Sequence, residues 1–278
     1  MSRHIVTFAK TSVAIDYPPG ELSELIEFLY RDVASDPGIP TSDALRITRQ
    51  AGPAAEWHIL HENTPVATAG SVEALAAPLI EETLRRIVDH NRSGLAIHAA
   101  ALSQRGSGVL LPGPSGTGKS SLATWLTAHG FNYLGDELAV VEPDHTLDAF
   151  TRPIKLKTTG LAALRALIDV HRSEAGILFN GTTIMVPPQL LNPENARESP
   201  TLGLLVFPHY REQTRLTLTP ISPAQAGLVL MECLVNARNL AEHGFGAVAA
   251  LVREVPAFRL EYGGFEQLDA LLGWFRSA

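Results

Sequence analysis

The chain has 278 residues, enough for two domains of ordinary size or for one large one. It has 22 Lys and Arg and 29 Asp and Glu, which gives a formal net charge of −7. Because the sequence also has no basic tract, we expect no groove that binds nucleic acid. Hydrophobic residues make up 45%, and no apolar run approaches the roughly 18 residues of a membrane helix. We therefore expect a soluble, cytoplasmic protein with no membrane or nucleic-acid partner, and its single cysteine, Cys233, excludes an internal disulfide.

The first third of the sequence predicts a small α+β domain. Residues 4–17 alternate β-branched and aromatic side chains and predict one strand, and residues 22–33 carry the apolar stripe of an amphipathic helix. Three short strands are expected within residues 44–69. A second helix is expected to begin after Ser71, a good N-cap residue, and to end near residues 91–94.

From residue 95 the pattern of apolar residues changes. Two apolar runs, residues 95–102 and 109–111, flank a polar, glycine-bearing joint, which predicts a hairpin of neighbouring strands. We place a domain boundary near Ser93. Residues 1–92 then form an N-terminal domain suited to partner recognition, and residues 93–278 form a second, α/β domain.

A phosphate-binding loop pattern follows the second of these strands. The pattern is Gly, four residues, Gly, Lys and Ser or Thr, and its members are Gly113, Pro114, Ser115, Gly116, Thr117, Gly118, Lys119 and Ser120. Glycines let successive backbone amides turn toward phosphate oxygens, the lysine reaches the outer phosphates, and the hydroxyl binds Mg²⁺. A strand at residues 109–111 and an amphipathic helix at residues 120–129 flank the loop, as the motif requires.

Two acidic residues come next. Residues 131–134 predict a short strand that ends at Asp136 and Glu137 before the apolar pattern resumes. A polar loop tip is the ordinary explanation, but a nearby phosphate loop needs acids to hold a metal ion and to take a proton from an acceptor. His98 lies in the apolar run before the loop, where a histidine by itself is more often a hydrogen-bonded core residue.

Residues 98–141 resemble the catalytic core of the HPr kinase/phosphorylase family, whose fold is related to that of phosphoenolpyruvate carboxykinase. In that family a histidine stands 15 positions before the first loop glycine, as His98 does here, and an acidic pair occupies the positions of Asp136 and Glu137. The sequence departs from the family in having Glu137 where a second aspartate is usual and Ser121 where a glutamate is usual, and in lacking the glycine-rich signature associated with phosphorylase activity. It therefore resembles the related branch that phosphorylates serines of peptides or proteins.

The resemblance implies a phosphate-loop kinase core, a mixed sheet with flanking helices, that uses ATP and Mg²⁺. The loop from Gly113 through Ser121 would bind ATP. Lys119 would neutralise the transferring phosphoryl group, and Ser120 and Glu137 would hold Mg²⁺. By the same resemblance Asp136 is the base that deprotonates the acceptor hydroxyl, with its role and that of Glu137 open to exchange, and His98 lies near the γ-phosphate.

Two weaker signals lie farther along the chain. Lys155 and Lys157 alternate in a predicted strand, share one face, and are suited either to phosphates, to an acidic partner or to solvent. Arg211 and Arg215 follow another strand and are suited to supply positive charge to a transition state, or are ordinary surface arginines.

The sequence leaves other classes of function open. One is a nucleotide-gated regulatory module with slow ATPase activity, and another is a kinase of a small-molecule hydroxyl. A GTPase or a transporter ATPase is disfavoured because the sequence has no Asn-Lys-x-Asp and no Leu-Ser-Gly-Gly motif. The sequence names neither the acceptor nor the oligomeric state, so a homo-oligomer is also open.

Overall fold

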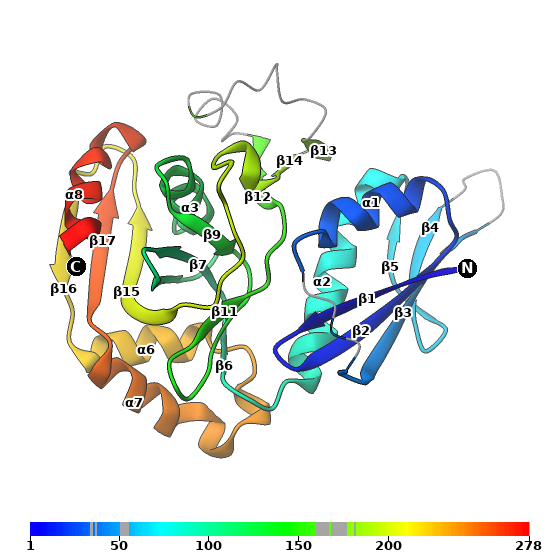
Figure 1. Cartoon of the computed structure of the whole chain (residues 1–278), viewed down its shortest axis with the longest axis horizontal. Helices are drawn as coiled ribbons and strands as arrows, with labels where there is room; N and C mark the ends of the chain where they lie inside the picture. The colour runs from blue at the N-terminus through cyan, green and yellow to red at the C-terminus, as the bar shows by residue number, and fades with distance from the viewer. Residues whose placement is uncertain are drawn as a thin grey trace.

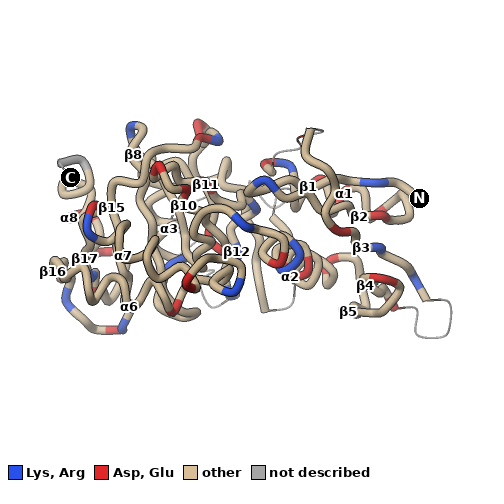
Figure 2. Tube along the Cα trace, turned by 90° about the horizontal axis from the view of Figure 1, so that it is seen from below, with Lys and Arg blue, Asp and Glu red and all other residues tan. Residues whose placement is uncertain are grey.

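The computed structural model of this protein describes residues 1–33, 36, 38–50, 56–158, 167, 177–180 and 182–277. Its α/β architecture has two parts that lie side by side, an N-terminal sheet with its helices and a larger body (Figure 1). Basic and acidic residues are interspersed over both parts (Figure 2). None of the helices in the described ranges combines the length and the apolar character needed to cross a membrane.

The N-terminal part is a five-stranded sheet with strand order β1-β2-β3-β4-β5. The strands are β1 (Ser2–Phe8), β2 (Thr11–Tyr17), β3 (Thr41–Arg49), β4 (Trp57–His61) and β5 (Thr64–Ala69). Helices α1 (Glu21–Tyr30) and α2 (Val72–His90) pack on it, and α2 lies between this sheet and the rest of the molecule (Figure 1). The Ser71 side chain accepts a hydrogen bond from the amide of Ala74 at 3.2 Å, which confirms the predicted helix start.

The prediction of one strand over residues 4–17 is wrong. The chain reverses at Ala9 and Lys10, whose φ angles are +49° and +62°, and β1 and β2 pair as an antiparallel hairpin. Such a two-residue turn normally contains Asn or Gly, because other residues rarely adopt positive φ. Ala-Lys gives no such signal, so the hairpin is invisible in the sequence pattern.

The larger body is built on a six-stranded mixed sheet with strand order β16-β17-β15-β8-β7-β9. Its strands are β7 (Ala99–Gln104), β8 (Ser107–Pro112), β9 (Asn132–Gly135), β15 (Thr201–Tyr210), β16 (Thr217–Pro220) and β17 (Ala257–Tyr262). Strand β15 runs parallel to both β8 and β17, and the other pairs are antiparallel. The predicted hairpin of β7 and β8 is confirmed.

Both faces of this sheet are covered, so the body has two cores. Along β7, Ala100 and Leu102 face the core beneath α3 (Lys119–Ala128), whereas Ala99 and Ala101 face the core beneath α6 (Pro223–Cys233) and α7 (Phe245–Glu254). The near-continuous apolar run of this strand is what burial on both faces requires. Helix α8 (Asp269–Ser277) closes the first of the two cores.

Two small sheets connect the body with the N-terminal part. One contains β11 (Leu147–Ala149), β10 (Ala139–Val141) and β6 (Leu95–Ile97), and the other contains β12 (Ile154–Lys157), β14 (Thr183–Val186) and β13 (Leu178–Asn180). Phe150 and Met185 belong to the same buried cluster as the N-terminal sheet, and the Phe150 ring lies edge-on to Phe8, with centroids 5.7 Å apart. The two parts therefore share a core, and the division near Ser93 stays a prediction.

Candidate active site

The predicted phosphate loop joins the end of β8 to the start of α3. Gly116 and Gly118 have φ angles of +91° and +95°, which favour glycine, and residues 114–116 are exposed. The backbone amides of Lys119, Ser120 and Ser121 open α3 and make no hydrogen bond to another described residue. Free amides at a helix N-terminus favour the binding of an anion.

Two tyrosines hold the second half of this loop in place. The Tyr262 hydroxyl donates to the carbonyl oxygen of Gly118 at 2.9 Å, and the Tyr210 amide donates to the carbonyl oxygen of Thr117, also at 2.9 Å. A Cβ on Gly118 would overlap the Tyr262 hydroxyl and Cβ of Tyr210. Only glycine therefore fits at this position, for reasons of both space and backbone conformation.

Lys119 lies at the base of the loop with its ammonium group turned inward. Its Nζ donates to the carbonyl oxygens of Gly113 and Pro114, at 2.6 and 3.0 Å, and lies 3.2 Å from Nε2 of His98. Burial lowers the pKa of this ammonium group. Two of its acceptors are backbone carbonyl oxygens that phosphate oxygens can replace, and the third is the His98 ring.

His98 connects the loop to the acidic pair. Burial lowers the pKa of its imidazole, and the charge of Lys119 lowers it further. In the neutral ring, Nε2 accepts from Lys119 and Nδ1 donates to the backbone oxygen of Glu137 at 3.0 Å. The histidine therefore fixes the distance between the phosphate loop and the acidic pair.

The two acids have opposite environments. The Asp136 side chain is 0% exposed, and its Oδ1 accepts from the Tyr133 hydroxyl at 2.8 Å and from Arg152 at 2.9 Å. Its Oδ2 is buried without a hydrogen-bond partner. The Glu137 side chain is 41% exposed, and its Oε2 lies 2.9 Å from the same Arg152 Nη2. Arg152 thus holds both carboxylates.

These side chains meet because the chain changes sheets at each of them. His98 separates β6 from β7, and Asp136 and Glu137 separate β9 from β10; in both places the chain passes between the small β11-β10-β6 sheet and the six-stranded sheet. Arg152 lies between β11 and β12, which also belong to different sheets. The polar groups therefore gather at the junction of the sheets, where no ladder partner occupies the space.

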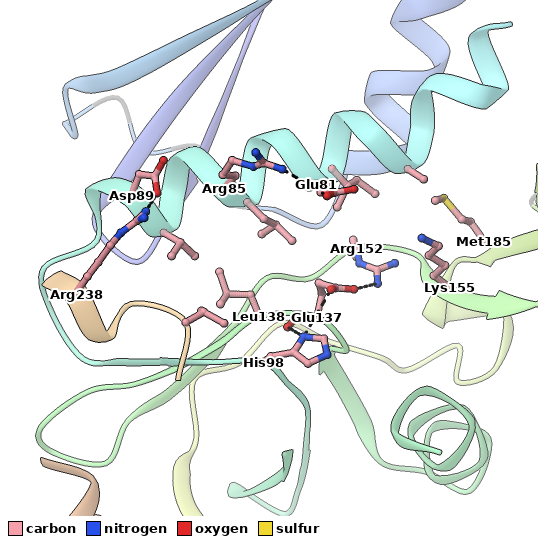
Figure 3. A pocket seen from close by; sticks show the side chains of 15 residues that line it. Glu81, Arg85, Asp89, His98, Glu137, Leu138, Arg152, Lys155, Met185 and Arg238 are labelled. Atoms are coloured by element: carbon pink, nitrogen blue, oxygen red, sulfur yellow. Dashed lines mark hydrogen bonds and ion pairs between the residues drawn. The ribbon is translucent and has the colours of Figure 1, made fainter. Parts of the chain in front are cut away.

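A pocket of about 400 Å³ borders His98, and none of the loop residues lines it. His98, Glu137 and Arg152 line the side formed by the body, and α2 forms the opposite wall (Figure 3). Sites for small ligands range from about 300 to 1,000 Å³, so this pocket is of the size for a small molecule or a short segment of chain. It connects the N-terminal part directly to the predicted chemistry.

The lysines and arginines that the sequence indicated more weakly differ in whether they line the pocket. Lys155 lines the pocket, whereas Lys157, on the same strand, is exposed and does not line it. Arg211 and Arg215 are exposed beyond β15 and do not line the pocket either. Cys233 is buried, and burial raises the pKa of its thiol.

The sequence did not indicate Arg152, Tyr133 or Tyr262 as site residues. Arg152 is 2% exposed and bonded to both acids, and the two tyrosines bond Asp136 and Gly118. A buried arginine is expected only beside buried acids, so Arg152 becomes recognisable once Asp136 is known to be buried. No local sequence pattern marks it.

Within the described ranges, no group of three or more His, Cys, Asp or Glu side chains is arranged to hold a metal ion. The residues present nevertheless fit Mg²⁺ bound together with a nucleotide, because such a site needs only one or two protein ligands besides the phosphates. Asp136 Oδ2, a buried carboxylate oxygen without a partner, is suited to bind the ion or one of its waters. The open space beside Gly116 and the free amides of α3 suit the phosphates.

No protein-family model matches this chain, and no curated protein matches it. Among solved structures, the chain is similar to the Hpr(Ser) kinase/phosphatase from Coxiella burnetii, with 11% sequence identity and a TM-score of 0.35 over 66% of this chain and 94% of that chain. Similarity at this level assigns no function, so the chemistry has to be inferred from the site itself.

Proposed function

We propose that this protein is a Mg²⁺- and ATP-dependent kinase that transfers the γ-phosphoryl group to a serine hydroxyl of a small protein or peptide. The observation that carries the proposal is the 3.2 Å contact between Lys119 in the loop and His98, which also borders the 400 Å³ pocket. A module that only binds ATP needs no pocket beside His98 in addition to its phosphate loop. The choice of serine rests on the resemblance of residues 98–141 to HPr kinases.

The loop supports nucleotide binding through its amides and its lysine. The amides that open α3 would contact phosphate oxygens, and Lys119 would exchange its carbonyl acceptors for them. Bound ATP supplies the phosphoryl group, and Mg²⁺ neutralises charge on it. His98 keeps the Lys119 ammonium directed toward the junction of loop and pocket, so we assign it a positioning role.

The burial of the two acids favours exchanging the roles that the sequence suggests. Glu137 borders the pocket, so we assign it to take the proton of the acceptor hydroxyl as the new oxygen–phosphorus bond forms and the bond to ADP breaks. Asp136 is enclosed, and we assign its free Oδ2, with the Ser120 hydroxyl, to Mg²⁺. Arg152 Nη2 lies 2.9 Å from an oxygen of each carboxylate and so keeps the two acids beside each other.

The test is phosphoryl transfer by the purified full chain with Mg²⁺-ATP and a degenerate library of serine peptides, with threonine and tyrosine libraries as specificity controls. We expect ADP release together with phosphoserine detected by mass spectrometry, both lost in Lys119→Ala and both retained in Lys157→Ala, a lysine that is exposed and outside the site. ADP release without any phosphopeptide would instead favour a regulatory ATPase.

A further inference from the structure

The pocket between α2 and the body has a charge pattern that the proposed kinase chemistry does not explain. Besides His98, it is lined by four Lys and Arg side chains and three acidic ones, and each acid is paired with an arginine. Glu81 lies 3.6 Å from Arg85, Asp89 is bonded to Arg238, and Glu137 is bonded to Arg152 (Figure 3). The remaining basic side chain is Lys155.

Lys155 is the cation of this lining that has no ion pair within the described part of the chain. It projects from β12, between the buried Ile154 and Leu156, toward the space below α2 (Figure 3). Lys155 faces a partly enclosed cavity and has no carboxylate partner among the described residues. Such a lysine leaves a local positive potential in the cavity. An occupant with a carboxylate would complete the pairing.

Apart from His98, the rest of the wall is apolar. Ile80, Leu84 and Val88 follow one another at four-residue spacing on α2 and face Leu138 and Met185 across the pocket. Ile80, Leu84, Leu138 and Met185 belong to the same buried cluster as Leu75 and Leu79 of the N-terminal core, so this core extends to the wall of the pocket. The pocket therefore combines an apolar wall with three ion pairs and one unpaired lysine, beside the residues that would carry out the transfer.

We propose that this pocket binds the acceptor, a short extended peptide segment whose serine lies close to an apolar side chain and to a carboxylate. The apolar side chain packs between α2 and Leu138, the carboxylate pairs with Lys155, and the serine hydroxyl is thereby brought to Glu137. This inference rests on the proposed kinase function and names the acceptor class for it. An aspartate or glutamate side chain and a free C-terminus both supply such a carboxylate.

The experiment compares serine peptides with an apolar neighbour that carry Asp, Ala or Lys within three positions of the serine, each with a free and with an amidated C-terminus. Enzyme variants are Lys155→Ala, Lys155→Glu and the matched control Lys157→Ala on the same strand. We measure kcat and KM for each peptide, peptide binding without ATP by fluorescence anisotropy, and ATP hydrolysis without peptide.

Wild type is expected to favour the carboxylate-bearing peptides by about tenfold in kcat/KM, mainly through KM, since one ion pair at a partly enclosed site is of this size. Lys155→Glu is expected to reverse the preference toward the Lys peptide, a gain that a misfolded variant cannot show. Lys157→Ala is expected to behave as wild type, both with the peptides and in ATP hydrolysis without peptide. If only the free C-terminus matters, the carboxylate is terminal; if only Asp matters, it is a side chain.

Two results would overturn the inference. One is an equal preference in wild type and Lys155→Glu, in kinetics and in anisotropy alike. The other is ATP hydrolysis that responds to none of the peptides, which rejects the peptide pocket while leaving nucleotide chemistry intact. Absence of any ATP turnover or Mg²⁺-ATP binding is a different failure, since it rejects the proposed kinase function itself.

Discussion

The Lys119 ammonium lies 3.2 Å from Nε2 of His98, and through this contact the phosphate loop is joined to the acidic pair and to the pocket under α2. The histidine is held from its other nitrogen by the backbone of Glu137 at 3.0 Å. A displacement of the β6–β7 junction would therefore move the lysine and the acids together. The site therefore acts as one unit.

Arg152 is expected to be essential for stability as well as for the site. Arg152→Ala leaves the fully buried Asp136 without its cation, and breaking a buried pair in this way costs about 3–5 kcal/mol of unfolding free energy. Urea unfolding followed by circular dichroism measures it. The control is Arg3→Ala, which removes an exposed ion pair with Asp16 and is expected to leave the midpoint unchanged. Equal effects of the two substitutions would show that the Asp136 pair is not a buried one.

Alanine substitutions at two loop glycines with similar backbone conformations are expected to lower the free energy of unfolding by different amounts. Alanine at either Gly116 or Gly118 meets a left-handed φ, a penalty of about 1–2 kcal/mol. At Gly118 the new Cβ also overlaps Tyr262 and Tyr210, whereas at Gly116 it meets nothing within 4 Å. Gly118→Ala should therefore be less stable than Gly116→Ala by about 1–3 kcal/mol in unfolding free energy. Identical values would contradict the tyrosine contacts.

His98 is expected to make stability depend on pH in the mildly acidic range. Its pKa is lowered in the folded protein by burial and then by Lys119, whereas the unfolded chain has the ordinary value of about 6.5. Below about 6.5 the unfolded state binds a proton that the folded state does not, so stability falls as pH falls toward the lowered folded pKa. His98→Gln should flatten this slope between pH 7 and 5. An unchanged slope would mean that His98 titrates normally.

Substitutions at Ser120 and Ser121 compare a side chain whose hydroxyl is assigned to Mg²⁺ with one whose residue would contact phosphate through its backbone amide. Ser120→Ala removes the hydroxyl assigned to Mg²⁺, whereas Ser121→Ala keeps the backbone amide through which that residue would contact phosphate. We expect Ser120→Ala to weaken the apparent Mg²⁺ affinity of the ATP complex roughly tenfold or more, and Ser121→Ala to change it little. Magnesium titrations at fixed ATP measure both. A larger effect at Ser121 would reverse the assignment.

The strand and the helix that flank the loop could be predicted because each depends on local chemistry, and the roles of the loop and of the acidic pair stay predictions. Glycines at positive φ and a Lys-Ser pair at a helix start leave a pattern within eight residues. Arg152 leaves none, because its role arises only when the chain crosses between sheets 16 residues after Asp136. Likewise, residues 95–102 form one apolar run in the sequence, and the break at His98 comes from pairing with two different sheets.

The pocket was also beyond local sequence patterns. Its walls come from α2, from β12 and from the connection after β9, which are distant in the sequence and meet only through the core that Phe150 and Met185 share with the N-terminal sheet. The alternation of Lys155 and Lys157 correctly places them on one strand face. Which of the two meets the pocket depends on the position of α2.

Isothermal titration calorimetry of the full chain with Mg²⁺-ATP is the most direct test of whether the loop binds the nucleotide through Lys119. We predict saturable binding with one site per chain in wild type and in Lys157→Ala, and an affinity lower on the order of 100-fold in a folded Lys119→Ala. Absence of saturable binding by wild type, or equal affinity in Lys119→Ala, would contradict the account.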